Sequence, residues 1–328
     1  MGIIDSIKEM FGITPVSVGD LNRHATIDRP KPAPAPPPPD PLAGIEVIEE
    51  YKRVKGLLEA GFPIVFVSGK AGTGKSTLIH YIRHFYKRNL VVVAPTGVAA
   101  WNVHGSTIHS YFRFPPRIIN EDDIEPVRDR KLYTKLDLLI VDEISMVRAD
   151  VIDAMDLFLR KNGRDASFPF GGTQLLLVGD LFQLPPVVTR SEESMLFSRR
   201  YTSPYFFSAR VMDKCQIAPV GLEKIFRQRD PEFAALLNQV RIAANLDTVV
   251  PLVNTACYRD EESDNSILTL TCTNAVADRT NQAELDKLHG SARTYTGEVS
   301  GKFAVDDERL PSPLNLALKP GAQVMFTK

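Results

Sequence analysis

The stretch GKAGTGKST, residues 69–77, decides how the rest of the sequence is interpreted. It fits the pattern G-x-x-x-x-G-K-[ST], and it lies between the apolar run PIVFVSG (63–69) and a helical pattern over 75–87. Glycines at this place allow successive backbone N–H groups to curl around phosphate oxygens, and the helix N-terminus adds a favourable dipole. The sequence therefore predicts a strand, a phosphate-binding loop and a helix in that order.

Two residues of this loop have distinct expected roles. Lys75 is expected to reach the β- and γ-phosphates of a nucleotide, and the Ser76 hydroxyl is expected to bind Mg²⁺. The complete predicted nucleotide-binding set is Gly69, Ala71, Gly72, Thr73, Gly74, Lys75, Ser76 and Thr77. A nucleoside triphosphate with Mg²⁺ is the ligand that this set predicts.

Three further short runs are mainly apolar, like the run before the loop. They are LVVVAPTG (90–97), LDLLIVDE (136–143) and TQLLLVGD (173–180), and helical patterns such as 149–161 separate them. Strands that are apolar on both faces and alternate with helices are typical of a parallel sheet covered on both sides. We therefore predict an α/β fold.

Polar residues follow two of these runs. Asp142 and Glu143 end one of them, at the edge of the sheet where ligands bind in open α/β folds. Asp142 is expected to hold Mg²⁺ and Glu143 to polarise the attacking water, which favours hydrolysis over transfer to another substrate. Gln183, in QLLLVGDLFQLPPV (174–187), is a neutral amide that can hydrogen-bond both the γ-phosphate and the water. This combination predicts a nucleoside triphosphatase with a sensor.

The remaining sequence suggests four segments. An amphipathic segment (1–28) fits docking on the main body or binding of a protein partner, and a proline-rich linker (29–43) forms a stiff spacer. A first α/β domain (44–221) and a second, partial one (222–328) follow. In the second domain we predict helices over 233–243 and 275–288 and strands over 267–274 and 322–328.

Composition excludes several classes of protein. The 39 basic and 40 acidic residues balance, which excludes a cationic coat over the whole surface but allows a local basic groove. Cys215, Cys257 and Cys272 lack metal-type spacing, so we expect reduced, buried thiols in a cytoplasmic protein. No apolar run approaches the roughly 18 residues that a membrane helix needs, so we expect no membrane partner.

The order of motifs resembles that of the PIF-type helicases, superfamily-one motors related to RecD that move 5′→3′ on single-stranded DNA. The motifs that carry the resemblance are GKAGTGKST (69–77), APTGVAAWNVHGSTIHSYF (94–112), VDEIS (141–145), GDLFQLPPV (179–187) and LEKIFRQ (222–228). The resemblance implies a RecA-like P-loop ATPase domain followed by a partial second RecA-like domain. It also implies an ATP-dependent DNA helicase or translocase that acts on single-stranded or forked DNA, with roles in DNA repair, recombination and telomere maintenance.

The resemblance also implies residue roles. Arg227 matches the family's arginine finger, with a surface salt bridge as the alternative, and a small wedge that meets the DNA fork falls near 112–136. The implied DNA-binding residues are Pro95, Thr96, Gly97, Asn102, Thr107, His109, Ser110, Phe112, Thr271, Thr273 and Asn274. For Phe112 a place in the core, and for His109 a structural hydrogen bond, are the alternatives. We expect Trp101, the only tryptophan, to be a packing residue.

Two departures from the family leave the function open. The family's adenine-reading glutamine has no counterpart in 42–54, which leaves the choice between ATP and GTP undecided. Relatives also continue beyond the position of residue 328 with further motifs for DNA and ATP, so not all residues for unwinding are expected here. The alternatives to a helicase are a single-strand-binding ATPase or nucleotide-switched DNA-binding protein, and an AAA-like regulator without a nucleic-acid partner.

Overall fold

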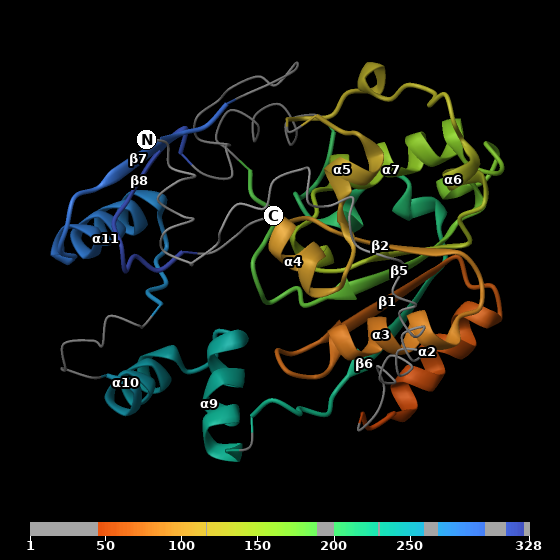
Figure 1. The fold of residues 1–328 in the computed structure, drawn as a ribbon. Helices are drawn as coiled ribbons and strands as arrows, with labels where there is room; N and C mark the ends of the chain where they lie inside the picture. Colours follow the sequence, from red (N-terminus) through yellow and green to blue (C-terminus); the bar gives the residue numbers. More distant parts are fainter. Residues whose placement is uncertain are drawn as a thin grey trace, which may run out of the picture. The chain divides into compact units, whose positions relative to one another are not determined.

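Figure 1 shows the computed structural model of the chain. It describes residues 45–328 except 116, 189–199, 229, 259–267, 299–312 and 325–328. The predicted amphipathic segment and the proline-rich linker therefore lie outside the described residues.

A six-stranded parallel sheet forms the centre of the fold, with the strand order β3-β2-β4-β5-β1-β6. The strands are β1 (Ile64–Gly69), β2 (Leu90–Ala94), β3 (Ser106–Thr107), β4 (Leu138–Val141), β5 (Gln174–Gly179) and β6 (Ile217–Leu222). The four apolar runs of the sequence form β1, β2, β4 and β5. The prediction of an α/β fold built on a parallel sheet is confirmed.

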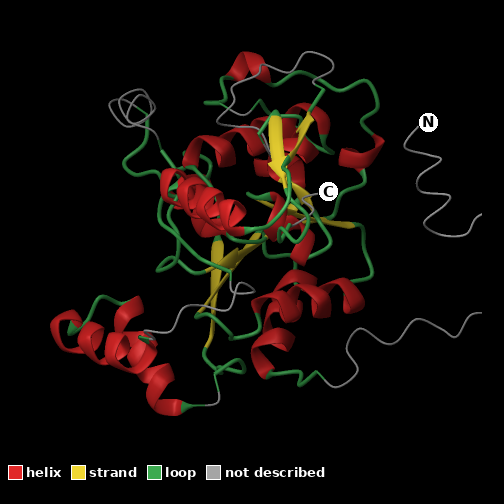
Figure 2. Ribbon diagram, turned by 60° about the vertical axis from the view of Figure 1, so that its left-hand side comes forward, coloured by secondary structure: helices red, strands yellow, loops and turns green. Residues whose placement is uncertain are grey.

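Both faces of the sheet are buried, which explains why its central strands are apolar at nearly every position. In β4, Leu139 and Val141 pack into one cluster with the helix α7 (Ala149–Asn162), while Leu138 and Ile140 are buried on the opposite face. There the helices α2 (Glu49–Glu59) and α3 (Lys75–Phe85) contact each other, and α2 contacts β1 and β6. Figures 1 and 2 show these two helical layers on either side of the strands.

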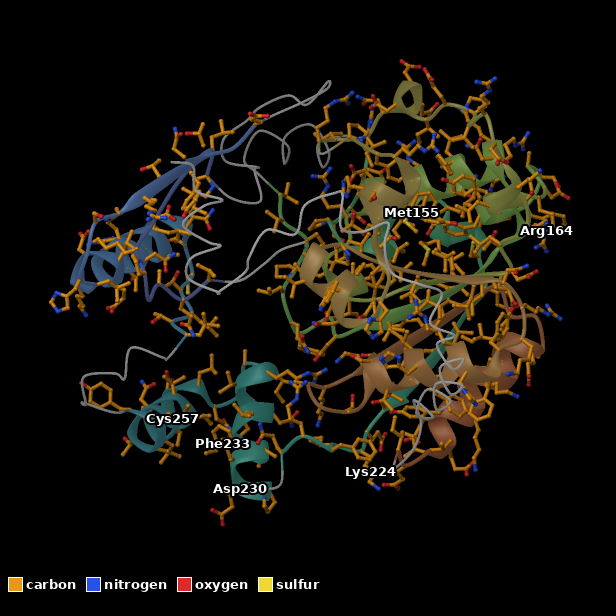
Figure 3. All side chains as sticks on the ribbon, in the orientation of Figure 1. Met155, Arg164, Lys224, Asp230, Phe233 and Cys257 are labelled. Carbon is orange, nitrogen blue, oxygen red and sulfur yellow. The ribbon has the colours of Figure 1, made fainter. Side chains whose placement is uncertain are left out.

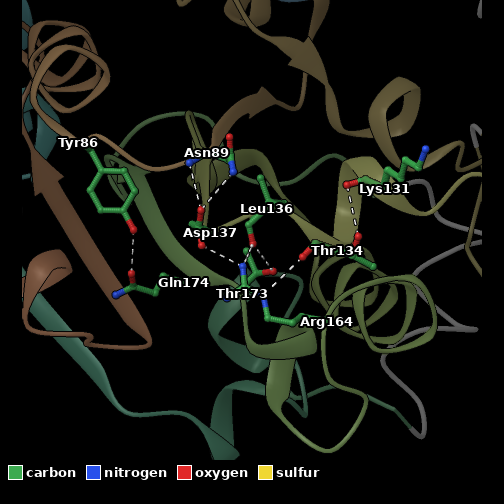
Figure 4. Close-up of polar contacts among 9 residues, drawn as sticks. All are labelled: Tyr86, Asn89, Lys131, Thr134, Leu136, Asp137, Arg164, Thr173 and Gln174. Atoms are coloured by element: carbon green, nitrogen blue, oxygen red, sulfur yellow. Dashed lines mark hydrogen bonds and ion pairs between the residues drawn. The ribbon is translucent and has the colours of Figure 1, made fainter.

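Polar contacts close the amino-terminal ends of the strands (Figure 4). The Asp137 carboxylate, just before β4, accepts the Asn89 backbone N–H at 3.1 Å and an Arg164 guanidinium N–H at 2.9 Å. The Tyr86 hydroxyl donates to the Gln174 side chain at 3.0 Å. These contacts hold the starts of β2, β4 and β5 in register.

Two strands of this sheet were not predicted, and both lie at its edges; the small antiparallel pair formed by residues 293–296 and 315–318 was not predicted either. β3 is two residues long and pairs with Val93 and Ala94 of β2. β6 has the sequence IAPVGL, in which Val220 and Leu222 are the buried residues. An edge strand tolerates proline, because one side of its backbone has no partner strand. β6 therefore contains Pro219 and lacks the continuous apolar run that identifies a central strand.

Beyond β6 the described residues form three helices and a small antiparallel pair of strands. These elements are α9 (Pro231–Arg241), α10 (Leu246–Cys257), α11 (Asn274–Lys287), β7 (Arg293–Thr296) and β8 (Asn315–Leu318). The helices predicted over 233–243 and 275–288 are confirmed. The division of the chain near residue 221 into two domains stays a prediction.

Three expectations for this part of the chain are wrong. Residues 268–273 form no strand, since they are exposed and no described strand pairs with them. Residues 322–324 form no strand either, and 325–328 lie outside the described residues. The expectation of buried thiols is wrong for Cys257, which ends the mostly exposed helix α10, and for Cys272, which lies in the exposed stretch before α11; Cys215, just before β6, is half-buried. In the part of the chain that the structure describes, no helix is long and apolar enough to cross a bilayer.

Ile140 tests the account of the sheet. Its side chain is fully buried in β4, between Val92 of β2 and Leu176 of β5. Ile140→Ala should lower the free energy of unfolding by about 2–5 kcal/mol, because it removes buried methyl groups and leaves a cavity. Urea unfolding followed by circular dichroism measures this loss.

The matched control is Leu132→Ala, since the Leu132 side chain is 55% exposed. This substitution should change the free energy of unfolding by no more than about 0.5 kcal/mol. Equal losses for the two variants would contradict the described burial of β4.

Candidate functional site

The carboxyl ends of all six strands lie at one edge of the sheet, because every neighbouring pair is parallel. β1 leads there into the loop 70–74, β4 into Asp142 and Glu143, and β5 into Asp180. This edge is where ligands bind in open α/β sheets. The fold therefore brings together three of the predicted functional segments.

The loop 70–74 is packed so closely that glycine is required at its turns. Gly72 and Gly74 have φ angles of +79° and +87°, in the left-handed region. A Cβ atom on Gly74 would overlap the hydroxyl of Tyr51, which donates a hydrogen bond to the Gly74 carbonyl at 2.8 Å. A Cβ atom on Gly69 would overlap Thr73. The backbone N–H groups of this cradle and the start of α3 fit the phosphates of a nucleotide.

Lys75, the first residue of α3, folds back over this cradle. Its ammonium group donates to the carbonyls of Gly69 at 2.8 Å and Lys70 at 3.1 Å. Burial lowers the pKa of Lys75, while the carboxylates of Asp180, Glu143 and Asp142 act in the opposite direction. The two carbonyl contacts hold the ammonium against the loop, where the charges of these carboxylates act on it.

Asp142 and Glu143 occupy unusual environments at the end of β4. Asp142 is 5% exposed, and its backbone N–H donates to the Val93 carbonyl at 2.9 Å. Burial, followed by the adjacent charge of Glu143, raises the pKa of Asp142 to about 6. Glu143 has φ +49° and ψ +44°, a conformation that typically costs a residue other than glycine about 1–3 kcal/mol. Such strain is common at functional sites.

The loop after β5 is organised around Asp180, whose side chain is 0% exposed. The carboxylate accepts the Phe182 backbone N–H at 3.1 Å and the Gln183 side-chain amide at 3.2 Å. Arg241, at the end of α9, forms two further hydrogen bonds with it. Burial alone would raise the pKa of Asp180, but the hydrogen bonds from Arg241, Phe182 and Gln183 outweigh it and lower the pKa. Asp180 therefore stays charged.

The segment after β6 contacts the loop 70–74. The Phe226 backbone N–H donates to the Gly72 carbonyl at 2.8 Å, and a Cβ atom on Gly72 would overlap Arg227. Lys224, labelled in Figure 3, lies over the Phe226 ring at 5.1 Å and pairs with Glu46 at 2.6 Å. The predicted arginine-finger residue thus belongs to a segment that touches the loop directly.

Two of the predicted DNA-binding threonines cap helices at this edge. Thr96, after β2, accepts the Ala99 N–H at 3.2 Å and begins α4 (Gly97–Asn102). Thr107 accepts the Ser110 N–H at 3.2 Å and begins α5 (Ile108–Phe112). A capping hydroxyl accepts a hydrogen bond through its oxygen and still has a proton to donate to a phosphate. Of the neighbouring predicted residues, Pro95 is half-buried and Gly97, Asn102 and Ser110 are exposed.

The aromatic residues of this region differ in their burial. Phe112 is 1% exposed and packs between the rings of Phe114 and Phe158, so it has no face for a base, and the alternative of a core aromatic is correct. Trp101 is 74% exposed on α4, so the expectation that it is a packing residue is wrong. This short helix buries only Ala100 against the protein and leaves the Trp101 side chain exposed. His109 is half-buried, and burial followed by the charge of Arg148 lowers its pKa.

The remaining predicted DNA-binding residues lie at the start of α11. Thr273 accepts the Val276 N–H at 3.4 Å, and the Thr271 hydroxyl donates to the Thr273 carbonyl at 3.0 Å. Both threonines and Asn274 are exposed. The stretch predicted as a wedge, 112–136, is irregular apart from short helical turns such as α6 (Lys131–Thr134).

Sequence reasoning missed two polar contacts of the site. The hydrogen bond from Tyr51 beneath the loop and the pair between Arg241 and Asp180 join residues that are 23 and 61 positions apart. Neither has a sequence signal, because Tyr51 reads as an apolar residue of an amphipathic helix and Arg241 as a basic residue near a helix end.

Gly74 tests the geometry of the loop. Gly74→Ala should lower the free energy of unfolding by at least about 1–2 kcal/mol, since it combines a left-handed backbone with an overlap at Tyr51. Gly56→Ala is the control: this helical glycine has nothing within 4 Å of an added Cβ, and alanine should stabilise α2 by about 0.5–1 kcal/mol. Thermal unfolding of both variants measures the difference, and a neutral Gly74→Ala would contradict the described loop.

A family model, curated relatives and solved structures all indicate the same family. Residues 51–244 match the family model described as PIF1-like helicase. The "ATP-dependent DNA helicase PIF1" of Emericella nidulans is 34% identical over 84% of this chain and 38% of its own length. The protein of the same name from Danio rerio is 33% identical over 80% of this chain and 41% of its own length. The chain thus spans about two fifths of the length of these curated relatives.

Solved structures show the same likeness. The Pif1 helicase from Bacteroides in complex with ADP-AlF3 and single-stranded DNA has a TM-score of 0.72 and 33% identity. The similarity extends over 84% of this chain and 64% of the Bacteroides protein. Bacteroides Pif1 bound to single-stranded DNA has a TM-score of 0.71 and 34% identity, with the same coverage.

Proposed function

The chain belongs to the PIF1-like helicase family, and on this basis we propose that it is an ATP-dependent DNA helicase that moves 5′→3′ on single-stranded DNA. The observation that carries the proposal is that the parallel strands bring the loop 70–74 with Lys75 and the pair Asp142 and Glu143 to one edge of the sheet. Related Pif1 proteins have been solved with ADP-AlF3 and with single-stranded or forked DNA.

ATP is the proposed substrate, and its phosphates are held by the backbone N–H groups of the loop 70–74 and by Lys75. Mg²⁺, when bound, neutralises charge on the phosphates; the hard oxygen donors of Ser76 and Asp142 are those that it prefers. Glu143 orients and polarises the attacking water, and Gln183 hydrogen-bonds that water and the γ-phosphate. Arg227 stabilises the negative charge that develops as the phosphate bond breaks.

The proposed path for single-stranded DNA runs along the ends of β2 and β3. The Thr96 and Thr107 hydroxyls donate hydrogen bonds to phosphates, and Trp101, on α4, stacks on a base. The start of α11, with Thr271, Thr273 and Asn274, supplies the second contact. Closure of the two proposed domains, 44–221 and 222–328, on ATP would move one contact relative to the other and advance the strand.

The Glu143 carboxylate tests the chemical step. Glu143→Gln should keep nucleotide affinity within about threefold but lower ATP turnover at least about 100-fold, because the amide cannot accept a proton from water. Turnover is measured at low salt with and without a single-stranded oligonucleotide, which should stimulate the wild-type protein about tenfold or more. Glu59→Gln, at the end of α2, is the control; wild-type turnover in Glu143→Gln would remove Glu143 from the site.

A fork-unwinding assay separates the proposed helicase from its alternative. Displacement of the paired strand in the presence of ATP is the expected result. DNA-stimulated turnover without displacement would instead support an ATPase that binds single strands and does not unwind them. Absence of stimulation by DNA would contradict both functions.

Trp101 provides a direct test of the proposed DNA path. It is the only tryptophan and is 74% exposed, so its fluorescence reports on α4 alone. Single-stranded DNA should quench this fluorescence, and Trp101→Ala should weaken binding about 5- to 100-fold, since stacking of one base contributes about 1–3 kcal/mol. Trp101→Phe should restore part of the affinity. Tight binding without quenching, and with no loss in Trp101→Ala, would place the DNA elsewhere.

A further inference from the structure

Arg241 joins α9 to the loop after β5. Its Nε lies 2.9 Å from one carboxylate oxygen of Asp180, and its Nη2 lies 2.7 Å from the other. This is the bidentate geometry for which a guanidinium is suited and an ammonium is not. The pair is shielded from water, since Asp180 is fully buried and the Arg241 side chain is 18% exposed.

The same guanidinium stacks on the loop itself. Its Cζ lies 4.3 Å from the centroid of the Phe182 ring, while the Phe182 backbone N–H donates to the Asp180 carboxylate. The Gln183 amide donates to the carboxylate oxygen that accepts Arg241 Nε. Arg241 therefore contacts two residues of this loop, Asp180 and Phe182, and shares an acceptor with the proposed sensor Gln183.

Packing does not provide an equivalent connection. Among the described residues of α9, no side chain is buried, and α10 is the element that α9 contacts most. Asp230 caps the helix through the N–H groups of Glu232 and Phe233, and Figure 3 labels Asp230 and Phe233 at its start. The charge pair at the end of α9, rather than an apolar interface, thus connects this helix with the sheet edge.

The segment from Phe226 to Arg241 touches the site at both ends. Phe226 is hydrogen-bonded to Gly72 of the phosphate loop, and Arg241 to Asp180 of the loop that carries Gln183. Both loops of the site are therefore bonded to the one segment that contains α9.

We propose that Arg241 is a positioning residue for ATP hydrolysis, which holds Asp180 and through it the Gln183 amide, and which couples this loop to α9. The inference rests on the proposed function, because it assigns a role within the same site. Arg241 does not touch the reacting atoms; it fixes the group that reads them.

The test compares Arg241→Ala and Arg241→Lys with Arg293→Ala, an exposed arginine of β7 outside the site. Two quantities are measured in the full chain: steady-state ATP turnover with single-stranded DNA, and hydrogen–deuterium exchange of residues 180–187. In Arg241→Ala, kcat should fall at least tenfold while KM for ATP stays within threefold. The amides of 180–187 should exchange at least tenfold faster. Arg241→Lys should recover part of both, and Arg293→Ala should match the wild type.

The two readouts keep the inference separate from the proposed function. Unchanged exchange in Arg241→Ala would overturn the inference whatever the turnover, and faster exchange with unchanged kcat would overturn the positioning role. A fall that lies only in KM would also contradict it. If the wild type does not hydrolyse ATP, the proposed function fails, and the exchange result alone decides whether Arg241 holds the loop. Should Arg241→Ala not fold, Arg241→Lys and Arg241→Gln carry the same comparison.

Discussion

The parallel register of the six strands is the constraint on which the rest of the structure depends. It places the ends of β1, β4 and β5 at one edge, so that a phosphate loop, a pair of carboxyl groups and an amide-bearing loop converge although they are far apart in the sequence. The register is held by buried apolar residues on both faces and by polar contacts at the opposite ends of the strands. Such a site needs no single continuous motif, because the parallel direction of the strands brings separate short segments together.

The two buried aspartates at this edge have pKa values that are shifted in opposite directions. Burial, with little compensation, raises the pKa of Asp142, whereas the hydrogen bonds from Arg241, Phe182 and Gln183 lower the pKa of Asp180 despite its burial. Within the described ranges no cationic side chain hydrogen-bonds the Asp142 carboxyl group, which leaves its oxygens suited to a divalent cation. Asp180 already has its cation in Arg241 and is suited to organising the loop.

Local patterns predicted the parts of the fold that local physics determines. The central strands and the helices α3 and α7 follow from apolar runs and periodicity, because their residues are buried on one or both faces. Helical patterns also predicted α9 and α11, although no described side chain of either helix is buried, and α10 was not predicted. The edge strands β3 and β6 lacked such a pattern, and the stretch 268–273 alternated like a strand but found no partner. At the site, the loop and the carboxylates were predictable from spacing. Tyr51 and Arg241 were not predictable, since their roles arise from contacts between residues far apart in the sequence. Phe112, expected at the DNA, is buried, and Trp101, expected in the packing, is exposed, because burial depends on neighbours that the periodicity of a sequence does not identify.

The most direct test of the central claim is calorimetric titration of Mg²⁺ with a non-hydrolysable ATP analogue into the wild-type chain and into Lys75→Ala. The account predicts one site in the wild type and a loss of affinity of at least about 100-fold in Lys75→Ala, because a buried charge-assisted contact to phosphate is removed. Circular dichroism should show the same folded α/β domain in both. Equal affinities for the folded wild type and variant would mean that the nucleotide does not bind at the loop 70–74, and the account of the sheet edge as an ATP site would be contradicted.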